Sequence, residues 1–280
     1  MTCRYSRMTG ALAALTVTLL LGAGCGSSPS QPRALAPAGT AATTAPSRAL
    51  RVLVTNDDGY SAAGIDAVVE GLRALPDTEV TVVAPLTNQS GTGGKTTSGA
   101  LTVTDVKTAS GYAAKAVDGY PADTIVWAID QHGIAFNPDV VISGINFGQN
   151  VGRANSISGT VGAARAAAAR GIPALAASQA LPDPVDFPAG VTQVLSWLSG
   201  HRAAILDGSA RSPMVLHGLN VPTCVTGAVR GLVEVPISAR EGTLDLAPSD
   251  CTSTKTGPAD DEAGLAEGFA TLSNIPLTAS

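Results

Sequence analysis

A short apolar run that ends in two adjacent acidic residues constrains the fold of this chain more than any other feature. Residues 50–55 (LRVLVT) have the composition of a buried strand, and residues 56–59 (NDDG) follow as a polar turn. Apolar residues then recur at helical spacing over 64–75, and residues 80–84 form the next apolar run. A strand, a turn, a helix and a strand in this order predict parallel strands joined by a crossover helix, which indicates an α/β fold.

The same alternation of strand and helix patterns continues along the chain. We expect helices over about 124–131, 159–170 and 191–198, and strands over 138–144, 171–178 and 215–221. After residue 222 the helical periodicity fades, and we expect strands over 225–235 and 269–277. With 280 residues, 45% of them hydrophobic, the chain is long enough for one domain with a sizeable core, which we place at 50–280.

Residues 1–25 are predicted to be an export signal that is not part of this domain. Arg4 and Arg7 precede an apolar run over about 11–23, which is too short for a comfortable membrane span. The small residues before Cys25 resemble a bacterial lipobox, although Gly22 stands where that pattern has Leu. We expect a lipid on Cys25 that anchors the protein at the outer face of the membrane. The alternative is an ordinary secretory signal and a secreted protein.

Residues 26–49 are predicted to be a flexible linker, because they are mostly Ser, Pro, Ala, Thr and Gly. Of the four cysteines, Cys3 lies in the signal and Cys25 at the anchor, which leaves Cys224 and Cys251 in the domain. Two remaining cysteines in an exported protein suggest one disulfide. The alternative is two separate buried thiols.

The charge of the chain limits its partners. Charged residues make up 14% of the chain and the net charge is -5, without a run rich in Lys or Arg. Binding to a nucleic-acid polymer through its phosphates is therefore not expected. A mildly acidic protein can still bind a small anion where a metal ion and backbone N–H groups supply local positive charge.

Three polar clusters follow predicted strands: Asp57-Asp58 after the first, residues 88–91 (NQSG) after the second, and Asn146 after 138–144. Ligands in open α/β sheets bind beyond the carboxyl ends of the strands, so we expect these clusters to converge. Adjacent carboxylates raise each other's pKa unless a cation relieves the repulsion. An all-oxygen set of Asp57, Asp58, Ser90 and Asn146 suits Mg²⁺, Mn²⁺ or Ca²⁺ better than Zn²⁺. A solvated turn is the alternative for Asp-Asp-Gly taken alone.

Two further segments are candidates for contact with a phosphate. Ser158, Gly159 and Thr160 open an Ala-rich helix, whose free N–H groups and dipole favour an anion, although Ser158 could equally be a simple N-cap. Residues 91–96 (GTGGKT) miss the P-loop pattern, because Gln89 stands where that pattern requires Gly. We expect a loop that borders the site, with Lys95 as a candidate phosphate contact.

Taken together and in order, these segments resemble the SurE family. The resemblance rests on the segments 54–59 (VTNDDG), 82–85 (VVAP) with 88–91 (NQSG), 119–123 (GYPAD), 138–150 (PDVVISGINFGQN), 158–164 (SGTVGAA), 171–174 (GIPA) and 219–222 (LNVP). It extends from about Arg51 to the C-terminus. Each motif alone is weak, but their ordered set is specific.

The resemblance implies a Rossmann-like three-layer sandwich with a mostly parallel sheet. It implies a β-rich extension over about 225–280 that helps to build a homodimer or homotetramer. It also implies one divalent metal ion per subunit, Mg²⁺ or Mn²⁺, held by Asp57, Asp58, Ser90 and Asn146, with the two Asp residues catalytic. Phosphate contacts are expected from Ser158, Gly159 and Thr160, and further substrate contacts from Asn56, Lys95 and Gly144.

The family's activity is hydrolysis of 5′- and 3′-nucleoside monophosphates, sometimes with short polyphosphate. We therefore expect a phosphatase that acts on a nucleoside monophosphate or another small phosphate ester. Residues 153–157 (RANSI) depart from the family, which usually has an acidic residue and a Tyr in this interval, and this bears on substrate preference. The predicted export signal is a second departure, because most members are cytoplasmic. The alternative function is a lipid-tethered module that binds phosphate or nucleotide without turnover.

Overall fold

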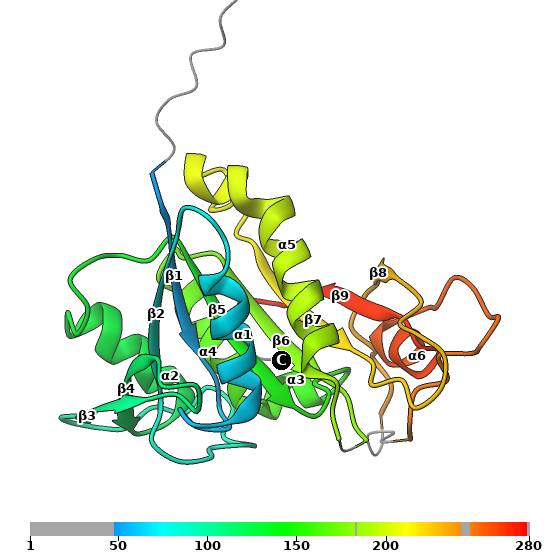
Figure 1. Cartoon of the computed structure of the whole chain (residues 1–280), viewed down its shortest axis with the longest axis horizontal. Coiled ribbons are helices and arrows are strands. Elements are labelled where there is room, and N and C mark those ends of the chain that lie inside the picture. The colour runs from blue at the N-terminus through cyan, green and yellow to red at the C-terminus, as the bar shows by residue number, and fades with distance from the viewer. Residues whose placement is uncertain (1–47, 183, 242–246, 279–280) are drawn as a thin grey trace, which may run out of the picture. The chain divides into compact units, whose positions relative to one another are not determined.

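A mostly parallel sheet forms the centre of the domain (Figure 1). The computed structural model describes residues 48–182, 184–241 and 247–278, so the predicted signal, Cys25 and nearly all of the predicted linker lie outside the described residues. Within the described residues, nine strands form one sheet in the order β3-β4-β2-β1-β5-β6-β7-β9-β8. The strands are β1 (Leu50–Thr55), β2 (Thr78–Pro85), β3 (Thr102–Lys107), β4 (Ala113–Asp118), β5 (Val140–Phe147), β6 (Ala174–Gln179), β7 (Leu216–Val221), β8 (Leu232–Glu234) and β9 (Ala270–Asn274).

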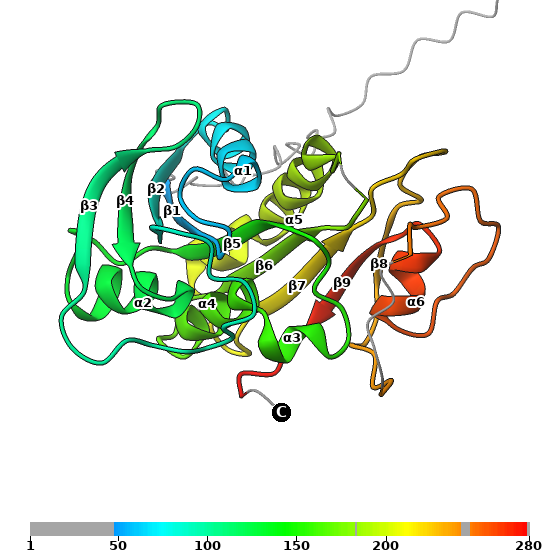
Figure 2. The same cartoon turned by 90° about the horizontal axis from the view of Figure 1, so that it is seen from below.

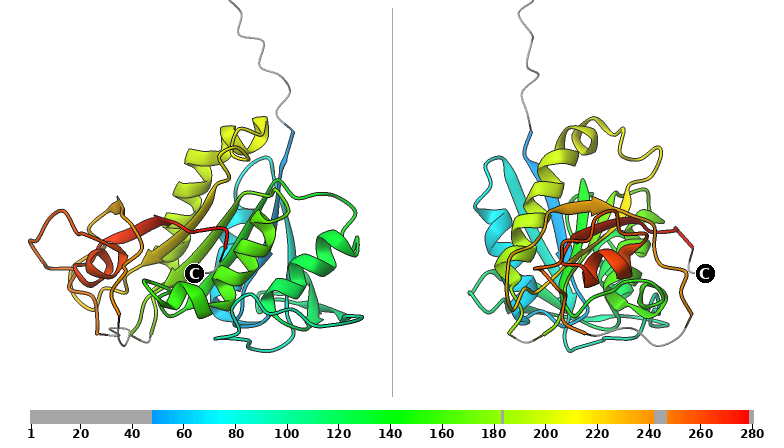
Figure 3. Two further views of the ribbon diagram at one scale, coloured as in Figure 1. Left: turned by 180° about the vertical axis from the view of Figure 1, so that it is seen from behind. Right: turned by 90° about the vertical axis from the view of Figure 1, so that its right-hand side faces the viewer.

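The strand directions confirm the predicted α/β class. Strands β4, β2, β1, β5, β6 and β7 pair with their neighbours in parallel, and β3 and β9 run antiparallel to β4 and β7. Strand β8 pairs in parallel with β9. Figure 3 shows the C-terminal extension at the opposite end of the sheet from the β3–β4 hairpin.

Helices cover both faces of the sheet (Figure 2). They are α1 (Ala63–Arg73), α2 (Pro121–Ile125) with the π-helical turn η1 (Val126–Asp130), α3 (Ala154–Ile157), α4 (Gly159–Ala168), α5 (Phe187–Asp207) and α6 (Asp261–Ala266). Helices α1 and α5 share one hydrophobic core with the sheet. Helices α2 and α4 share the other, in which five Ala residues of α4 lie close to the strands. In the described part of the chain, no helix has the length and apolar character needed to cross a membrane.

Helix α5 is much longer than the predicted 191–198. Its first turn contains Pro188, which precedes the predicted range, and Asp186 caps it by accepting a hydrogen bond from the Ala189 N–H at 3.2 Å. Proline suits the first turn of a helix because its missing N–H has no partner there and its φ is already helical. Gly208, with φ of 85°, ends the helix.

Other elements differ from the sequence-based expectation. No element is expected between 92 and 119, yet β3 and β4 form a hairpin there, because the outward-facing polar residues of β3 give no apolar signal. Of the expected strand 225–235, only β8 is a strand. Gly227 (φ 81°) and Gly231 (φ 99°) adopt left-handed backbone conformations that interrupt an extended chain. The short helix α6 is also not expected from the sequence.

Cys224 and Cys251 form a disulfide, with their Cα atoms 5.7 Å apart. It joins the loop after β7 to the segment that precedes α6. Gly268 packs against this bridge so closely that a Cβ there would lie 2.6 Å from the Cα of Cys251. The disulfide thereby ties the C-terminal extension to the end of β7.

Hydrogen bonds to the Asp139 side chain, just before β5, stabilise the amino edge of the sheet. Its side chain accepts hydrogen bonds from both terminal nitrogens of Arg48, at 2.5 and 2.7 Å, and from the Arg51 N–H at 2.9 Å. Burial alone would raise the pKa of this carboxyl, but the hydrogen bond from Arg48 and the other contacts hold the pKa below its ordinary value. We expect Asp139→Asn to lower the free energy of unfolding by about 1.5–3 kcal/mol at pH 7.

Because the folded-state pKa of Asp139 is lowered, its contribution is present above the unfolded pKa of about 3.9 and is lost as the pH falls through the folded value. The difference between wild type and variant should therefore shrink from pH 7 to pH 3, as measured by urea unfolding. Asp105→Asn is the control, because its ion pair with Lys115 is exposed and should contribute less than about 1 kcal/mol. An equal loss at both pH values would contradict this account.

Candidate functional site

The carboxyl ends of β1, β2 and β5 lie side by side, because β1 pairs in parallel with both of its neighbours. The loop after β2 is attached to the turn after β1 by a hydrogen bond of 2.7 Å from the Gln89 N–H to the Asp57 carbonyl. The end of β5 is attached to the same turn through the Phe147 N–H, which donates to Asp58 Oδ2 at 2.9 Å. The three polar clusters found in the sequence thus meet at one edge of the sheet.

The Asn56 side chain stabilises the turn that carries Asp57 and Asp58. Its side chain is fully buried, donates to the Gly59 carbonyl at 2.9 Å and accepts from the Gly59 N–H at 3.3 Å. Gly59 has φ of 103°, which favours glycine, so the turn depends on both residues. The structure gives the Asn56 side chain no exposed atom with which to contact a substrate.

Asp57 lies against the first turn of α4. Its side chain is buried, and its Oδ1 accepts a hydrogen bond of 2.6 Å from the Thr160 hydroxyl. Burial raises the pKa of Asp57, while hydrogen bonds from the Thr160 hydroxyl and from the backbone of Gly159 and Thr160 act in the opposite direction. A Cβ on Gly159 would lie 2.8 Å from the Cβ of Asp57, so only glycine permits this approach.

This arrangement gives the start of α4 a structural role in addition to the phosphate contacts expected from the sequence. Ser158 is the N-cap, and its hydroxyl oxygen accepts a hydrogen bond from the Val161 N–H at 3.1 Å. The Thr160 hydroxyl and the backbone of Gly159 and Thr160 hydrogen-bond to the carboxylate of Asp57. The positive end of the helix therefore stabilises a protein anion in this structure.

Asp58 is less buried than Asp57 and is held from two sides. In addition to the Phe147 N–H, the side-chain amide of Asn88 donates to Asp58 Oδ1 at 3.2 Å, and Asn88 in turn accepts from the Ser90 N–H at 2.9 Å. Burial raises the pKa of Asp58 to about 6. The nearby charge of Asp57 adds to this rise, and the hydrogen bonds from Phe147 and Asn88 oppose it.

Asn146 lies inside β5 rather than after it, as a consequence of an irregularity in the strand. The pairing of β5 with β6 shifts register between Ser143 and Asn146, and a bulge of this kind redirects the side chains that follow. Gly144 makes the bulge possible: its φ is 133°, and a Cβ there would lie 2.2 Å from the Ala177 carbonyl oxygen. Gly144 is thus packed against β6. The Asn146 amide nitrogen donates to the Gly148 carbonyl at 2.5 Å. This leaves the side-chain oxygen of Asn146 as the atom that a cation would contact.

The residues present fit a hard divalent cation. Within the described residues, no Lys, Arg or His nitrogen lies within 4 Å of a carboxylate oxygen of Asp57 or Asp58, so these two acids have no ion pair. A divalent ion would offset the burial that raises both pKa values and the charge of Asp57 that adds to the rise for Asp58. Ser90, which is exposed, and Asn146 add neutral oxygens, the type of ligand that Mg²⁺ and Mn²⁺ prefer.

The loop that carries Lys95 is clamped over the start of α4. The Gly93 N–H donates to the Ile157 carbonyl at 2.9 Å, and a Cβ on Gly162 would lie 2.1 Å from the Gly93 carbonyl oxygen. On the other side of Lys95, the N–H and hydroxyl of Thr97 donate to Asp123 at 2.9 and 2.7 Å. Lys95 is exposed between these two attachments.

Asp123 and Asn88 are site residues that sequence reasoning does not select, although both lie in the quoted motifs. Asp123 is fully buried and also accepts the Tyr120 N–H at 2.8 Å, which caps α2. The signal was its position three residues after Tyr120, as in a capping box. Only the tertiary structure shows that the same carboxylate also fixes the loop of Lys95.

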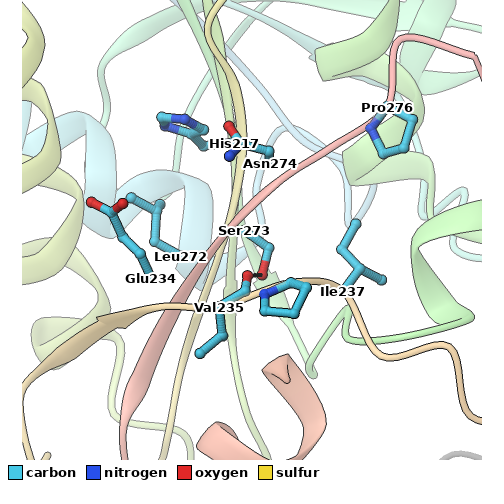
Figure 4. A pocket seen from close by; sticks show the side chains of 9 residues that line it. His217, Glu234, Val235, Ile237, Leu272, Ser273, Asn274 and Pro276 are labelled. Carbon is cyan, nitrogen blue, oxygen red and sulfur yellow. Dashed lines mark hydrogen bonds between the residues drawn. The ribbon is translucent and has the colours of Figure 1, made fainter. Parts of the chain in front are cut away.

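A cavity lies elsewhere, across β7, β9 and β8 (Figure 4). It has a volume of about 530 Å³, and its polar lining residues are His217, Glu234, Ser273 and Asn274. His217 accepts a hydrogen bond from the Trp197 indole N–H at 2.9 Å, and burial lowers the pKa of this histidine. None of Asp57, Asp58, Ser90 and Asn146 lines this cavity.

Comparisons with known proteins point to one family. The profile of the SurE family, described as survival protein SurE, matches residues 52–243. Three curated relatives are each named 5′-nucleotidase SurE. The protein of Methanopyrus kandleri is 38% identical over 57% of this chain and 64% of its own length. That of Treponema pallidum is 45% identical over 46% and 68%, and that of Syntrophobacter fumaroxidans 38% over 65% and 70%.

A solved structure, that of the SurE protein from Aquifex aeolicus, has a similar fold. It superimposes with a TM-score of 0.64 at 24% sequence identity, and covers 82% of this chain and 94% of the other. This likeness confirms the α/β architecture expected from the sequence. The match to the Methanopyrus relative spans less than two thirds of that protein's length.

The contact between Gly159 and Asp57 can be tested by a pair of glycine substitutions in helices. We expect Gly159→Ala to lower the free energy of unfolding by about 1–3 kcal/mol, because the new methyl group overlaps Asp57 and Pro121. Gly200→Ala, in α5, is the matched control, since nothing lies within 4 Å of its Cβ position. It should stabilise by roughly 0.5–1 kcal/mol through helix propensity. Equal urea-unfolding midpoints for both variants would refute the close packing.

Proposed function

This chain belongs to the SurE family, and we propose that it is a phosphatase that hydrolyses nucleoside 5′-monophosphates to nucleoside and phosphate. The curated relatives are named 5′-nucleotidases, which supports a phosphoric monoester hydrolase. The observation that carries the proposal is the pair of adjacent carboxylates at the carboxyl edge of the sheet, both with raised pKa values and with no ion pair among the described residues.

We assign Asp57, Asp58, Ser90 and Asn146 as the residues that would hold one Mg²⁺ or Mn²⁺ ion. Such an ion would neutralise charge on a phosphoryl oxygen and lower the pKa of a bound water. The structure supports this assignment through the all-oxygen chemistry of the four side chains and through the hydrogen bonds that join their loops.

The protein's own residues have separable tasks in this proposal. Thr160 and the N–H groups at the start of α4 fix the orientation of Asp57. Either Asp57 or Asp58 orients the attacking water and accepts its proton. The water oxygen forms a bond to phosphorus as the bond from phosphorus to the nucleoside oxygen breaks, and the proton taken by the carboxylate passes to the leaving nucleoside oxygen. Lys95, on its clamped loop, is the candidate cation for the phosphate oxygens.

Three further parts of the proposal concern the protein beyond this site. We propose that 3′-monophosphates are also substrates, that residues 225–280 contribute to a homodimer or homotetramer, and that the chain is exported and lipidated on Cys25. Light scattering would measure the assembly. Loss of the protein from the membrane fraction in Cys25→Ala would support lipidation, and unchanged fractionation would refute it.

The proposed activity can be tested by phosphate release from a panel of nucleoside 5′- and 3′-monophosphates with Mg²⁺, Mn²⁺ or EDTA. We expect release with either metal and none with EDTA. Asp57→Asn should reduce turnover by at least about 100-fold while the far-UV spectrum is unchanged, because the carboxylate charge is lost. Asp105→Asn removes an exposed carboxylate of β3 and serves as control.

Wild-type turnover in Asp57→Asn would refute the assigned role. If the folded protein binds metal and releases no phosphate from any substrate, the function becomes that of a nucleotide-binding module without turnover.

A further inference from the structure

Three exposed apolar side chains lie on the segments that build the candidate site. Of the large hydrophobic residues exposed in the described part of the chain, half lie on the segments that build the site. Leu86 (38% exposed) directly follows β2, Phe147 (47%) ends β5, and Ile157 (58%) directly precedes Ser158. The others, Val225, Leu232 and Leu277, belong to the C-terminal extension.

Each of the three residues is tied to the carboxylates by short connections. Phe147 is the most direct, because its own N–H donates to Asp58. Leu86 lies two residues before Asn88, whose side chain donates to the same carboxylate. Ile157 holds the loop of Lys95 through its carbonyl and is two residues from Gly159, which contacts Asp57. Three separate segments that build the polar centre thus each carry an exposed apolar side chain.

The exposure of Phe147 has no explanation in packing. Aromatic residues make up only 4% of the chain, and among the described aromatic side chains only Phe147 is among the exposed large hydrophobics. Leaving such a ring in water forgoes the stabilisation that burial provides. An apolar group that stays exposed beside a polar site is typical of a surface that binds a ligand.

We propose that Leu86, Phe147 and Ile157 form an apolar rim that binds the flat ring of the group esterified to the phosphate, with Phe147 stacking on that ring. The inference rests on the proposed phosphatase function and adds a determinant of specificity to it. The ring is a nucleobase, since it is the apolar, planar part of a nucleoside monophosphate. None of the three side chains has a hydrogen-bonding group, so the rim recognises the face of a base without distinguishing one base from another.

The matched pair of substrates for a test is adenosine 5′-monophosphate and ribose 5-phosphate, which share the phosphate ester and differ by the base. We expect wild type to prefer the nucleotide in kcat/KM. Phe147→Ala should reduce this preference by roughly tenfold, mainly through KM, as loss of one stacked base does. Phe147→Trp should restore it, because the rescue requires only an aromatic face. The spread among the four common nucleotides should be smaller than the gap to ribose 5-phosphate.

Val225→Ala is the control, because Val225 is the most exposed of the six large hydrophobic side chains named above and lies in the extension. It should leave the preference unchanged. If Phe147→Ala does not fold, Leu86→Ala and Ile157→Ala carry the test, each with a smaller reduction. An unchanged substrate preference in the folded rim variants overturns the proposal.

Failure of the proposed phosphatase function gives a different result from failure of the apolar rim. If wild type hydrolyses neither substrate, calorimetric binding of adenosine 5′-monophosphate and ribose 5-phosphate replaces the kinetics. Tighter binding of the nucleotide by wild type, lost in Phe147→Ala and regained in Phe147→Trp, supports the rim without catalysis. Equal binding of both compounds by wild type overturns it.

Discussion

The contact between the carboxylate of Asp57 and the first turn of α4 is the interaction on which the site depends. A buried carboxylate is costly unless hydrogen bonds or opposite charge compensate for the lost solvation. Thr160 and the backbone at Gly159 supply part of that compensation, yet the pKa of Asp57 is still raised. The protein therefore holds Asp57 in place without fully satisfying its charge, and Asp58 beside it increases the deficit. This unbalanced negative charge is the physical reason to expect a divalent cation there.

Glycine residues allow the segments of the site to approach this closely. Gly159 lets α4 rest on Asp57, Gly162 lets the loop of Lys95 rest on α4, and Gly144 lets β5 bend against β6. In each case a Cβ would lie 2.8 Å or less from its nearest neighbour, which no ordinary contact permits. The site is thus built by the close approach of backbone segments.

The site also combines two kinds of surface. The polar centre of Asp57 and Asp58 is suited to a metal ion and a phosphate, whereas the rim of Leu86, Phe147 and Ile157 is suited to a planar apolar ring. A substrate with an anionic end and an aromatic end satisfies both surfaces at once. The large cavity at β7, β9 and β8 belongs to the other end of the sheet and is not needed for this account.

The sequence by itself determined the α/β class and the convergence of three polar clusters, among them Asp57 and Asp58, at the carboxyl edge of the sheet, because apolar periodicity and turn chemistry are local properties. Only the tertiary structure decided which partners the polar groups of the site contact. The first turn of α4 hydrogen-bonds to Asp57, and the backbone N–H of the exposed Phe147 donates to Asp58. The Asn56 side chain closes the turn that carries both acids. The contacts of Asp57 with α4 and of Asp58 with Phe147 join residues far apart in the chain, and local sequence patterns do not specify such individual contacts.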